Sequence, residues 1–252
     1  MIENVTNNST QVDDSSLRAF VNDYFGYGNL NSPYWFIGKE EGGSVTLAEN
    51  NLRVAKWVEM GSPITLDTYV YHKSLGVSDY EFSRIQPTYT KIIQILLHLD
   101  GSGSDIDVRR AFQAGKLGRV DANHALLELM PLASRSTGLW LWKEQVSKAL
   151  NLHTRKQYWE TIMPKRIVAL KDLIAKHKPK LVLFYSTQTD YIRAWSQITG
   201  IDDWEWHKIS PYMKYGLQQV GNTLYVITTH PTMKGIKGRD FAEVAEKIQS
   251  LL

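Results

Sequence analysis

The residues best suited to chemistry stand near the C-terminus, where His230 and Pro231 follow an apolar segment. The next eight residues hold two glycines and three cations, and no acidic side chain. A histidine at the end of a strand can stabilise negative charge that develops during a reaction. An ordinary turn with solvated lysines is the simpler interpretation. The strand-end position, the glycines and the charge together favour a site for an anionic ligand.

Two other segments place polar groups after apolar runs. Glu40 and Glu41 lie within the glycine-containing segment 38–43, where the backbone can approach a ligand and a carboxylate can act as a general base. Arg135 stands beside three hydroxyl side chains, which together can bind a phosphate. Taken alone, the first segment is better explained as a solvated turn, and the second is equally compatible with one.

Composition excludes several kinds of site. The 252 residues are 43% hydrophobic and 22% charged, as in soluble globular proteins, and the net charge of +3 is only mildly basic. No apolar run approaches the roughly 20 residues that cross a bilayer, and the polar start lacks a secretory signal, so we expect a cytoplasmic protein without a membrane partner. The absence of cysteine excludes disulfides, thiolate nucleophiles and iron–sulfur clusters. The seven histidines are scattered, so no metal or other cofactor is expected.

Four apolar segments alternate with amphipathic helical patterns: residues 34–38, 124–132, 180–185 and 223–228. This order is typical of a parallel sheet with helices on both faces. We therefore expect an α/β fold, a three-layer α/β/α sandwich with a central, mostly parallel four-stranded sheet. Residues 1–16 are expected to be a disordered tail and residues 17–252 a single domain. Within that domain, residues 44–123 are a helical insertion that the sequence leaves open as a lid, a partner surface or core.

The same pattern predicts where a site would form. In such sheets ligands bind beyond the carboxyl ends of the strands, which here means the segments after Ile37, Leu132, Tyr185 and Thr228. Two expectations concern helices. Pro164 should interrupt the helical pattern that runs to His177. A last helix should start near Asp240, with Glu243 completing a capping box.

The order of four motifs resembles the uracil-DNA glycosylase superfamily: FIGKEEGG, LLELMPLASRS, KPKLVLFYS and THPTMKGIKGRDF. In that family a first loop handles the attacking water, a second strand carries a base-recognising asparagine, and the last strand ends in His-Pro-Ser. His230-Pro231-Thr232 differs from that motif by one conservative change. The resemblance spans roughly residues 34–251. It implies a uracil-DNA glycosylase-like fold and hydrolysis of the N-glycosidic bond of a damaged or deaminated base in DNA.

The resemblance also implies roles for individual residues. Glu40 would orient or deprotonate the attacking water, and His230 would donate a hydrogen bond to the departing base. The flipped base would be bound by Phe36, Gly38, Lys39, Glu41, Gly42, Glu128, Leu129, Pro231 and Thr232. The DNA, the expected partner, would be contacted by Ser134, Arg135, Met233, Lys234, Ile236, Lys237 and Arg239. Met233 or Ile236 would act as an apolar wedge in the duplex.

Two positions depart from the family. Glu41 replaces the proline of the first loop, and Glu128 or Leu129 stands at the place of the asparagine. A carboxylate suits an exocyclic amine, as in cytosine or adenine, better than the edge of uracil. The target base and catalysis therefore stay open. Two alternatives are a non-catalytic nucleic-acid-binding member of the same fold and an α/β protein that binds a small nucleotide or phosphate ligand.

Overall fold

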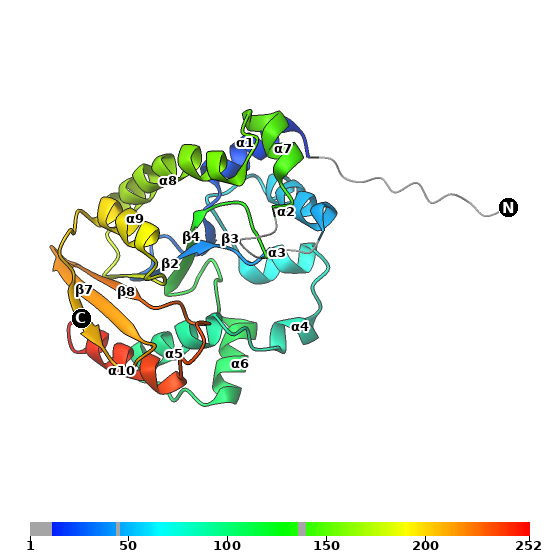
Figure 1. The fold of residues 1–252 in the computed structure, drawn as a ribbon. Helices are drawn as coiled ribbons and strands as arrows, with labels where there is room; N and C mark the ends of the chain where they lie inside the picture. The colour runs from blue at the N-terminus through cyan, green and yellow to red at the C-terminus, as the bar shows by residue number, and fades with distance from the viewer. Residues whose placement is uncertain (1–11, 44–45, 136–139) are drawn as a thin grey trace.

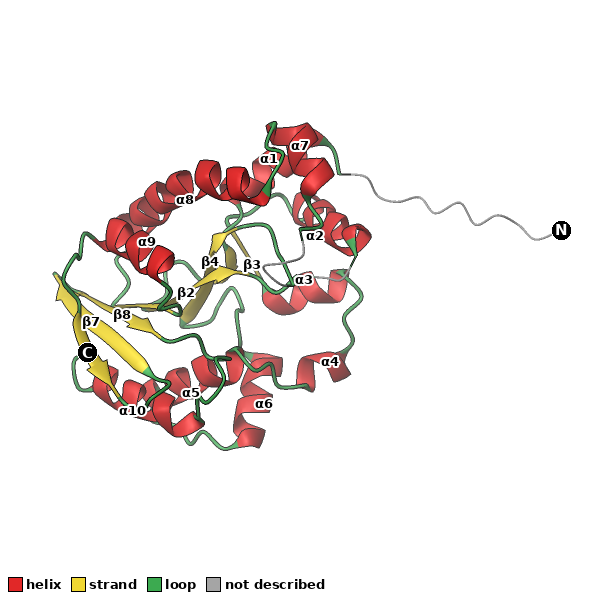
Figure 2. Cartoon of the chain, in the orientation of Figure 1, coloured by secondary structure: helices red, strands yellow, loops and turns green. Residues whose placement is uncertain are grey.

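The computed structural model describes residues 12–43, 46–135 and 140–252. Its strands are β1 (Gly26–Gly28), β2 (Tyr34–Glu40), β3 (Thr65–Leu66), β4 (His124–Met130), β5 (Leu181–Phe184), β6 (Glu205–Lys208), β7 (Lys214–Val220) and β8 (Thr223–Thr228). Its helices are α1 (Asp14–Asp23), α2 (Leu47–Glu59), α3 (Thr68–Ser74), α4 (Asp79–Ser83), α5 (Tyr89–Leu99), α6 (Ile106–Gly115), α7 (Lys143–Leu150), α8 (Arg155–His177), α9 (Thr189–Thr199) and α10 (Gly238–Gln249). Helices lie on both sides of a central sheet, with α1, α8 and α9 above it and α5 and α10 below it in Figures 1 and 2. The chain therefore has an α/β fold, as the alternating pattern predicts.

The sheet is mixed and has eight strands in the order β3-β1-β4-β2-β5-β8-β7-β6. The four expected strands form its centre, and β4, β2, β5 and β8 run parallel to one another. The expectation of a four-stranded sheet is wrong in number, because β1 pairs antiparallel with β4, and β7 and β6 extend the other side as an antiparallel hairpin. The added strands are either very short or contain glycine and polar residues. They therefore lack the continuous apolar runs that mark the central four.

Three helix boundaries differ from the expected ones. Helix α1 begins at Asp14, with Asp13 as its N-cap, so the expected tail reaches too far, and residues 1–11 lie outside the described part. Helix α8 continues through Pro164, because its apolar residues pack against the sheet over its length and this packing offsets the lost hydrogen bond. At the start of α10 the N–H of Lys237 donates to Asp240 at 2.7 Å, which gives Asp240 the capping role expected of Glu243.

The segment 44–123 is helical where it is described, since it contains α2 to α6 and only the short strand β3. Six consecutive residues of α5, Ile92 to Leu97, are buried, so this helix is enclosed around its whole circumference, and it packs closely against α10. Part of the insertion is therefore a layer of the core rather than an appendage. None of the helices in the described ranges is long and apolar enough to span a bilayer.

A buried arginine joins three elements behind the end of β4. Arg166 of α8 is 1% exposed and donates to the carbonyl oxygens of Glu128, Leu129 and Asn22 at 3.0–3.1 Å. Its guanidinium also lies 3.4 Å from the centre of the Phe25 ring. Burial lowers the pKa of Arg166 to about 9. One side chain thus fixes the backbone of β4 at residues 128 and 129 to α8 and α1.

Replacing this arginine tests that role. We expect Arg166→Met to lower the free energy of unfolding by about 3 kcal/mol, because one buried and two part-buried hydrogen bonds to carbonyl oxygens lose their donor. Urea unfolding followed by circular dichroism measures the change. Lys165→Met, at the exposed neighbouring position of the same helix, is the matched control and should cost less than about 0.5 kcal/mol. Equal stability of the two variants would contradict the role given to Arg166.

Candidate functional site

The carboxyl ends of the four parallel strands open into one cavity of about 630 Å³. Its lining comes from every predicted segment: Lys39 and Glu40 at the end of β2 and Glu41 and Gly42 after it, Glu128 in β4 and Ser134 and Arg135 after it, Tyr185 after β5, and His230 and Thr232 after β8. The opposite wall comes from the insertion and includes Arg53, His72, Phe82, Tyr89 and Gln113. The prediction that these strand ends form a site is consistent with this arrangement. The insertion supplies a wall of the cavity.

A buried carboxyl group forms part of the cavity lining. The hydroxyl of Tyr185 donates to Oε1 of Glu128 at 3.0 Å, while Oε2 is buried without a hydrogen-bond partner among the described residues. Burial raises the pKa of Glu128 to about 8, and the carboxylate of Glu41 acts in the same direction. Glu128 is therefore protonated at neutral pH and can donate one hydrogen bond as well as accept others.

Gly38 makes room for this pair of side chains. It lies opposite Glu128 in the register of β2 and β4. A Cβ atom at position 38 would lie 2.2 Å from Oε2 of Glu128 and 2.3 Å from the hydroxyl oxygen of Tyr185. The glycine is required at this place by the neighbouring side chains, in addition to the loop flexibility that the sequence suggests.

Glu41 is held by protein partners. Its Oε1 accepts from Arg53 at 2.8 Å and from the hydroxyl of Tyr27 at 2.9 Å, and Nε2 of His72 is 3.8 Å away. Burial alone would raise the pKa of Glu41, but Arg53 and His72 hold it below its ordinary value. Glu41 stays ionised and fastens the loop after β2 to α2 and α3. Its expected contact with a substrate is therefore secondary to this anchoring.

Glu40 forms an ion pair with Arg155 at the start of α8. Burial raises the pKa of Glu40, and the opposing effect of Arg155 is smaller. The Arg155 guanidinium lies 5.5 Å from the Trp140 ring centre and 5.4 Å from that of Trp159, so two aromatic rings are within cation–π distance of it. Nothing in the sequence pairs Arg155 with Glu40, which is 115 residues away.

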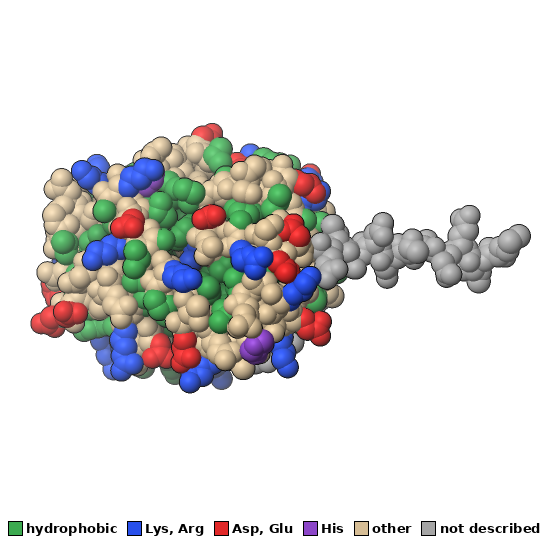
Figure 3. Space-filling model, turned by 90° about the horizontal axis from the view of Figure 1, so that it is seen from above, with side chains coloured by type: hydrophobic (Ala, Val, Ile, Leu, Met, Phe, Trp, Pro, Cys, Tyr) green, Lys and Arg blue, Asp and Glu red, His purple; other side chains and the backbone are tan. Residues whose placement is uncertain are grey.

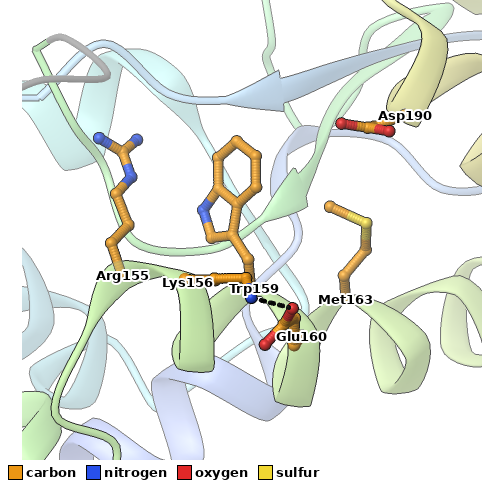
Figure 4. Close-up of a pocket in the computed structure, with 6 residues that line it drawn as sticks. All are labelled: Arg155, Lys156, Trp159, Glu160, Met163 and Asp190. Carbon is orange, nitrogen blue, oxygen red and sulfur yellow. Dashed lines mark ion pairs between the residues drawn. The ribbon is translucent and has the colours of Figure 1, made fainter.

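A second cavity, of about 600 Å³, lies on the other side of this ion pair. Its lining is Arg155, Lys156, Trp159, Glu160, Met163 and Asp190. In Figure 4 the side chains of Arg155 and Trp159 rise from α8 next to each other, and Asp190 approaches from α9. The Lys156–Glu160 ion pair of 3.3 Å lies along the helix. Sequence reasoning missed this cavity, because its residues follow no strand.

His230 presents one ring nitrogen as a donor. The N–H of Thr232 donates to Nδ1 at 3.3 Å, and the Thr232 hydroxyl lies 2.9 Å from the same atom. Burial, and secondly Lys39, lowers the pKa of His230 to about 4, so the ring is neutral at neutral pH. With Nδ1 accepting, the proton is on Nε2. The ring also contacts Tyr185 edge-on, at 5.8 Å between centroids, which brings β5 and β8 together at the site.

Several predicted site residues lie elsewhere. Phe36 and Leu129 are fully buried and neither lines the cavity, so the geometry of the cavity gives no support to the stacking role expected of Phe36 or the reading role expected of Leu129. Residues in strands point alternately to opposite faces, which is why Glu128 is in the lining and Leu129 is not. Pro231 is buried and Ile236 packs against the core. Four of the residues expected to contact DNA have exposed side chains outside the cavity: Met233, Lys234, Lys237 and Arg239.

No group of three histidine, aspartate or glutamate side chains able to hold a metal ion lies within residues 12–43, 46–135 and 140–252. No protein-family model matches the chain, and comparisons with curated proteins and with solved structures give no significant match. The cavity and its side chains are therefore the features of the chain that bear on its function.

The protonated state of Glu128 can be tested through stability. The folded protein keeps this proton up to about pH 8, whereas the unfolded chain releases it near pH 4.5, so the free energy of unfolding falls as the pH rises through this window. Glu128→Gln imitates the protonated acid and removes the dependence. We expect the variant to gain about 5 kcal/mol relative to the natural chain between the two ends of the window.

Urea unfolding of both proteins across this pH range gives the difference directly. Glu160→Gln, on the exposed side of α8, serves as control and should follow the natural chain. Parallel stability curves for Glu128→Gln and the natural chain would mean that Glu128 is ionised in the folded protein.

Proposed function

We propose that this protein hydrolyses the N-glycosidic bond of a damaged or deaminated base in DNA, with a uracil-DNA glycosylase-like domain. The observation that supports it most is the meeting of two neutral donors, His230 and protonated Glu128, in one cavity with the carboxylate of Glu40. The four motifs that carry the resemblance contain the lining residues at the ends of β2, β4, β5 and β8.

The groups match the charges of the reaction. As the bond from the sugar carbon to the base breaks, the base leaves with the electron pair and positive charge develops on the sugar. The Nε2–H of His230 would stabilise the departing anion, and a neutral imidazole does so without protonating the base beforehand. Glu40 would orient the water whose oxygen bonds to the sugar carbon and would take its proton. The base anion then takes up a proton as it is released.

Glu128 would read the base. With Tyr185 donating to Oε1, the proton of the carboxyl group is on Oε2, which presents a donor beside an acceptor. Such a group can pair with the C=O and N–H edge of uracil or hypoxanthine, which an ionised carboxylate cannot. The preference for exocyclic amines expected from sequence assumed an ionised Glu128. A protonated Glu128 would instead suit bases with a C=O and N–H edge (lactam bases), such as uracil and hypoxanthine.

A free nucleotide is the alternative ligand that one observation favours. The insertion covers one side of the cavity, and about 630 Å³ is within the range of sites for small molecules. Lys39 and Arg135 would then hold a phosphate. Tight binding of a nucleoside monophosphate, without affinity for oligonucleotides, would favour this alternative.

Base release tests the main proposal. Purified protein is incubated with labelled single- and double-stranded oligonucleotides that carry uracil, hypoxanthine, xanthine or a mismatch, and abasic sites are then cut with alkali. We expect cleavage of a lactam base, lowered about 100-fold in His230→Ala through loss of the donor to the leaving base, and similarly in Glu40→Gln.

His153→Ala, at an exposed position outside both cavities, is the matched control and should keep the natural rate. Unchanged release in His230→Ala would remove the role given to His230. No release from any substrate, with salt-sensitive binding retained, would favour the non-catalytic nucleic-acid binder.

The pH dependence of release tests the reading role of Glu128. Release should fall as the pH rises through about 8, where Glu128 ionises and loses its donor. Glu128→Gln keeps a donor and an acceptor at every pH, so its release should not fall there. Single-turnover rates at saturating substrate measure both profiles. An identical fall in the two proteins would assign the titration to another group.

A further inference from the structure

The tip of the β6–β7 hairpin packs on the loop that carries His230. The N–H of Thr229 donates to the carbonyl oxygen of Lys214 at 3.1 Å. Gly235 has a φ of +94°, and a Cβ there would lie 2.5 Å from atoms of the Tyr212 ring. The glycine thus lets this ring lie against the loop backbone. Residues 206–214 and 230–239, which we call the basic rim, form one continuous surface beside the cavity.

The basic rim has one sign of charge. Its two segments contain no aspartate or glutamate, and their Lys and Arg side chains are all exposed: Lys208, Lys214, Lys234, Lys237 and Arg239. By contrast, the face seen in Figure 3, where α7 and α8 lie, shows acidic and basic side chains interspersed. A run of uncompensated cations next to the cavity attracts a polyanion, and phosphates bound there would release counterions.

The basic rim also exposes large apolar side chains. Tyr212 is 52% exposed, Met233 50% and Trp206 40%. The Lys214 ammonium lies 4.7 Å from the centre of the Trp206 ring, which places this cation over one of the exposed rings. A ring held against backbone on one side and open to solvent offers a flat surface on which a base can stack. Only an unpaired base can use it, because the bases of a duplex are already stacked.

We propose that the basic rim binds single-stranded DNA, with Tyr212 stacking on a base and Lys208 and Lys214 contacting phosphates, and so leads the strand to the cavity. This inference rests on the proposed function for the identity of the strand. It adds the β6–β7 hairpin, which the resemblance does not assign to DNA binding, and it makes single strands the preferred substrate.

Fluorescence anisotropy with a labelled oligothymidylate and with a blunt duplex of the same length tests the inference. We expect tighter binding of the single strand. Tyr212→Ala should weaken that binding about tenfold, and Tyr212→Phe should keep it. Lys208→Ala combined with Lys214→Ala should lower the slope of log affinity against log salt by about 1.4, from about 0.7 for each phosphate contact. The control is Lys165→Ala combined with Lys171→Ala, two exposed lysines of α8.

Binding that is unchanged in Tyr212→Ala and in the lysine pair, or that is tighter for the duplex, overturns the inference. The base-release assay separates the two proposals. If a base is released and the variants bind normally, the proposed function is supported and the binding role of the basic rim is excluded. If binding depends on Tyr212 and the lysines but no base is released from any substrate, the binding role is supported and the proposed function is excluded.

Discussion

The burial of one carboxyl group constrains most of the site. Glu128 is fixed through its N–H, which donates to Phe25 at 2.8 Å, through its carbonyl, which accepts from Arg166, and through its side chain, which accepts from Tyr185. The segment between α1 and β1, helix α8 and the end of β5 therefore have to meet β4 correctly before the carboxyl group can be enclosed. Once it is enclosed, the proton stays on it, since ionising a buried group without a cation partner costs several kcal/mol.

Two other carboxyl groups of the cavity, Glu40 and Glu41, differ from Glu128 because each has an arginine. Arg53 keeps Glu41 ionised, and Arg155 opposes the rise that burial causes in the pKa of Glu40. The cavity thus holds a neutral acid, an ionised anchor, and a third carboxyl group whose pKa is raised by burial against the effect of an arginine. Pairs of groups whose surroundings separate their pKa values are what acid–base chemistry uses. The difference arises from the helices that face each carboxylate, namely α2 for Glu41 and α8 for Glu40.

The sequence predicts the central strands and the segments that line the cavity, because continuous apolar runs and strand-end loops are local features. It does not predict the contact between Glu40 and Arg155, which depends on how α8 is placed against β2. Tyr185 could have been found, since it ends a predicted strand at the edge where ligands bind. The hairpin strands β6 and β7 were missed because exposed and glycine-containing strands lack apolar periodicity. The protonation of Glu128 needs the depth of burial, which no local pattern gives.

The close contacts around Gly38 constrain which substitutions can occur at positions 38, 128 and 185. Its missing side chain is space that Glu128 and Tyr185 already fill, so the three positions form one unit across β4, β2 and β5. A lineage that acquires a side chain at position 38 would have to shorten the residue at 128 or 185 at the same time. Among descendants of this chain, the glycine, the glutamate and the tyrosine should be kept together or lost together.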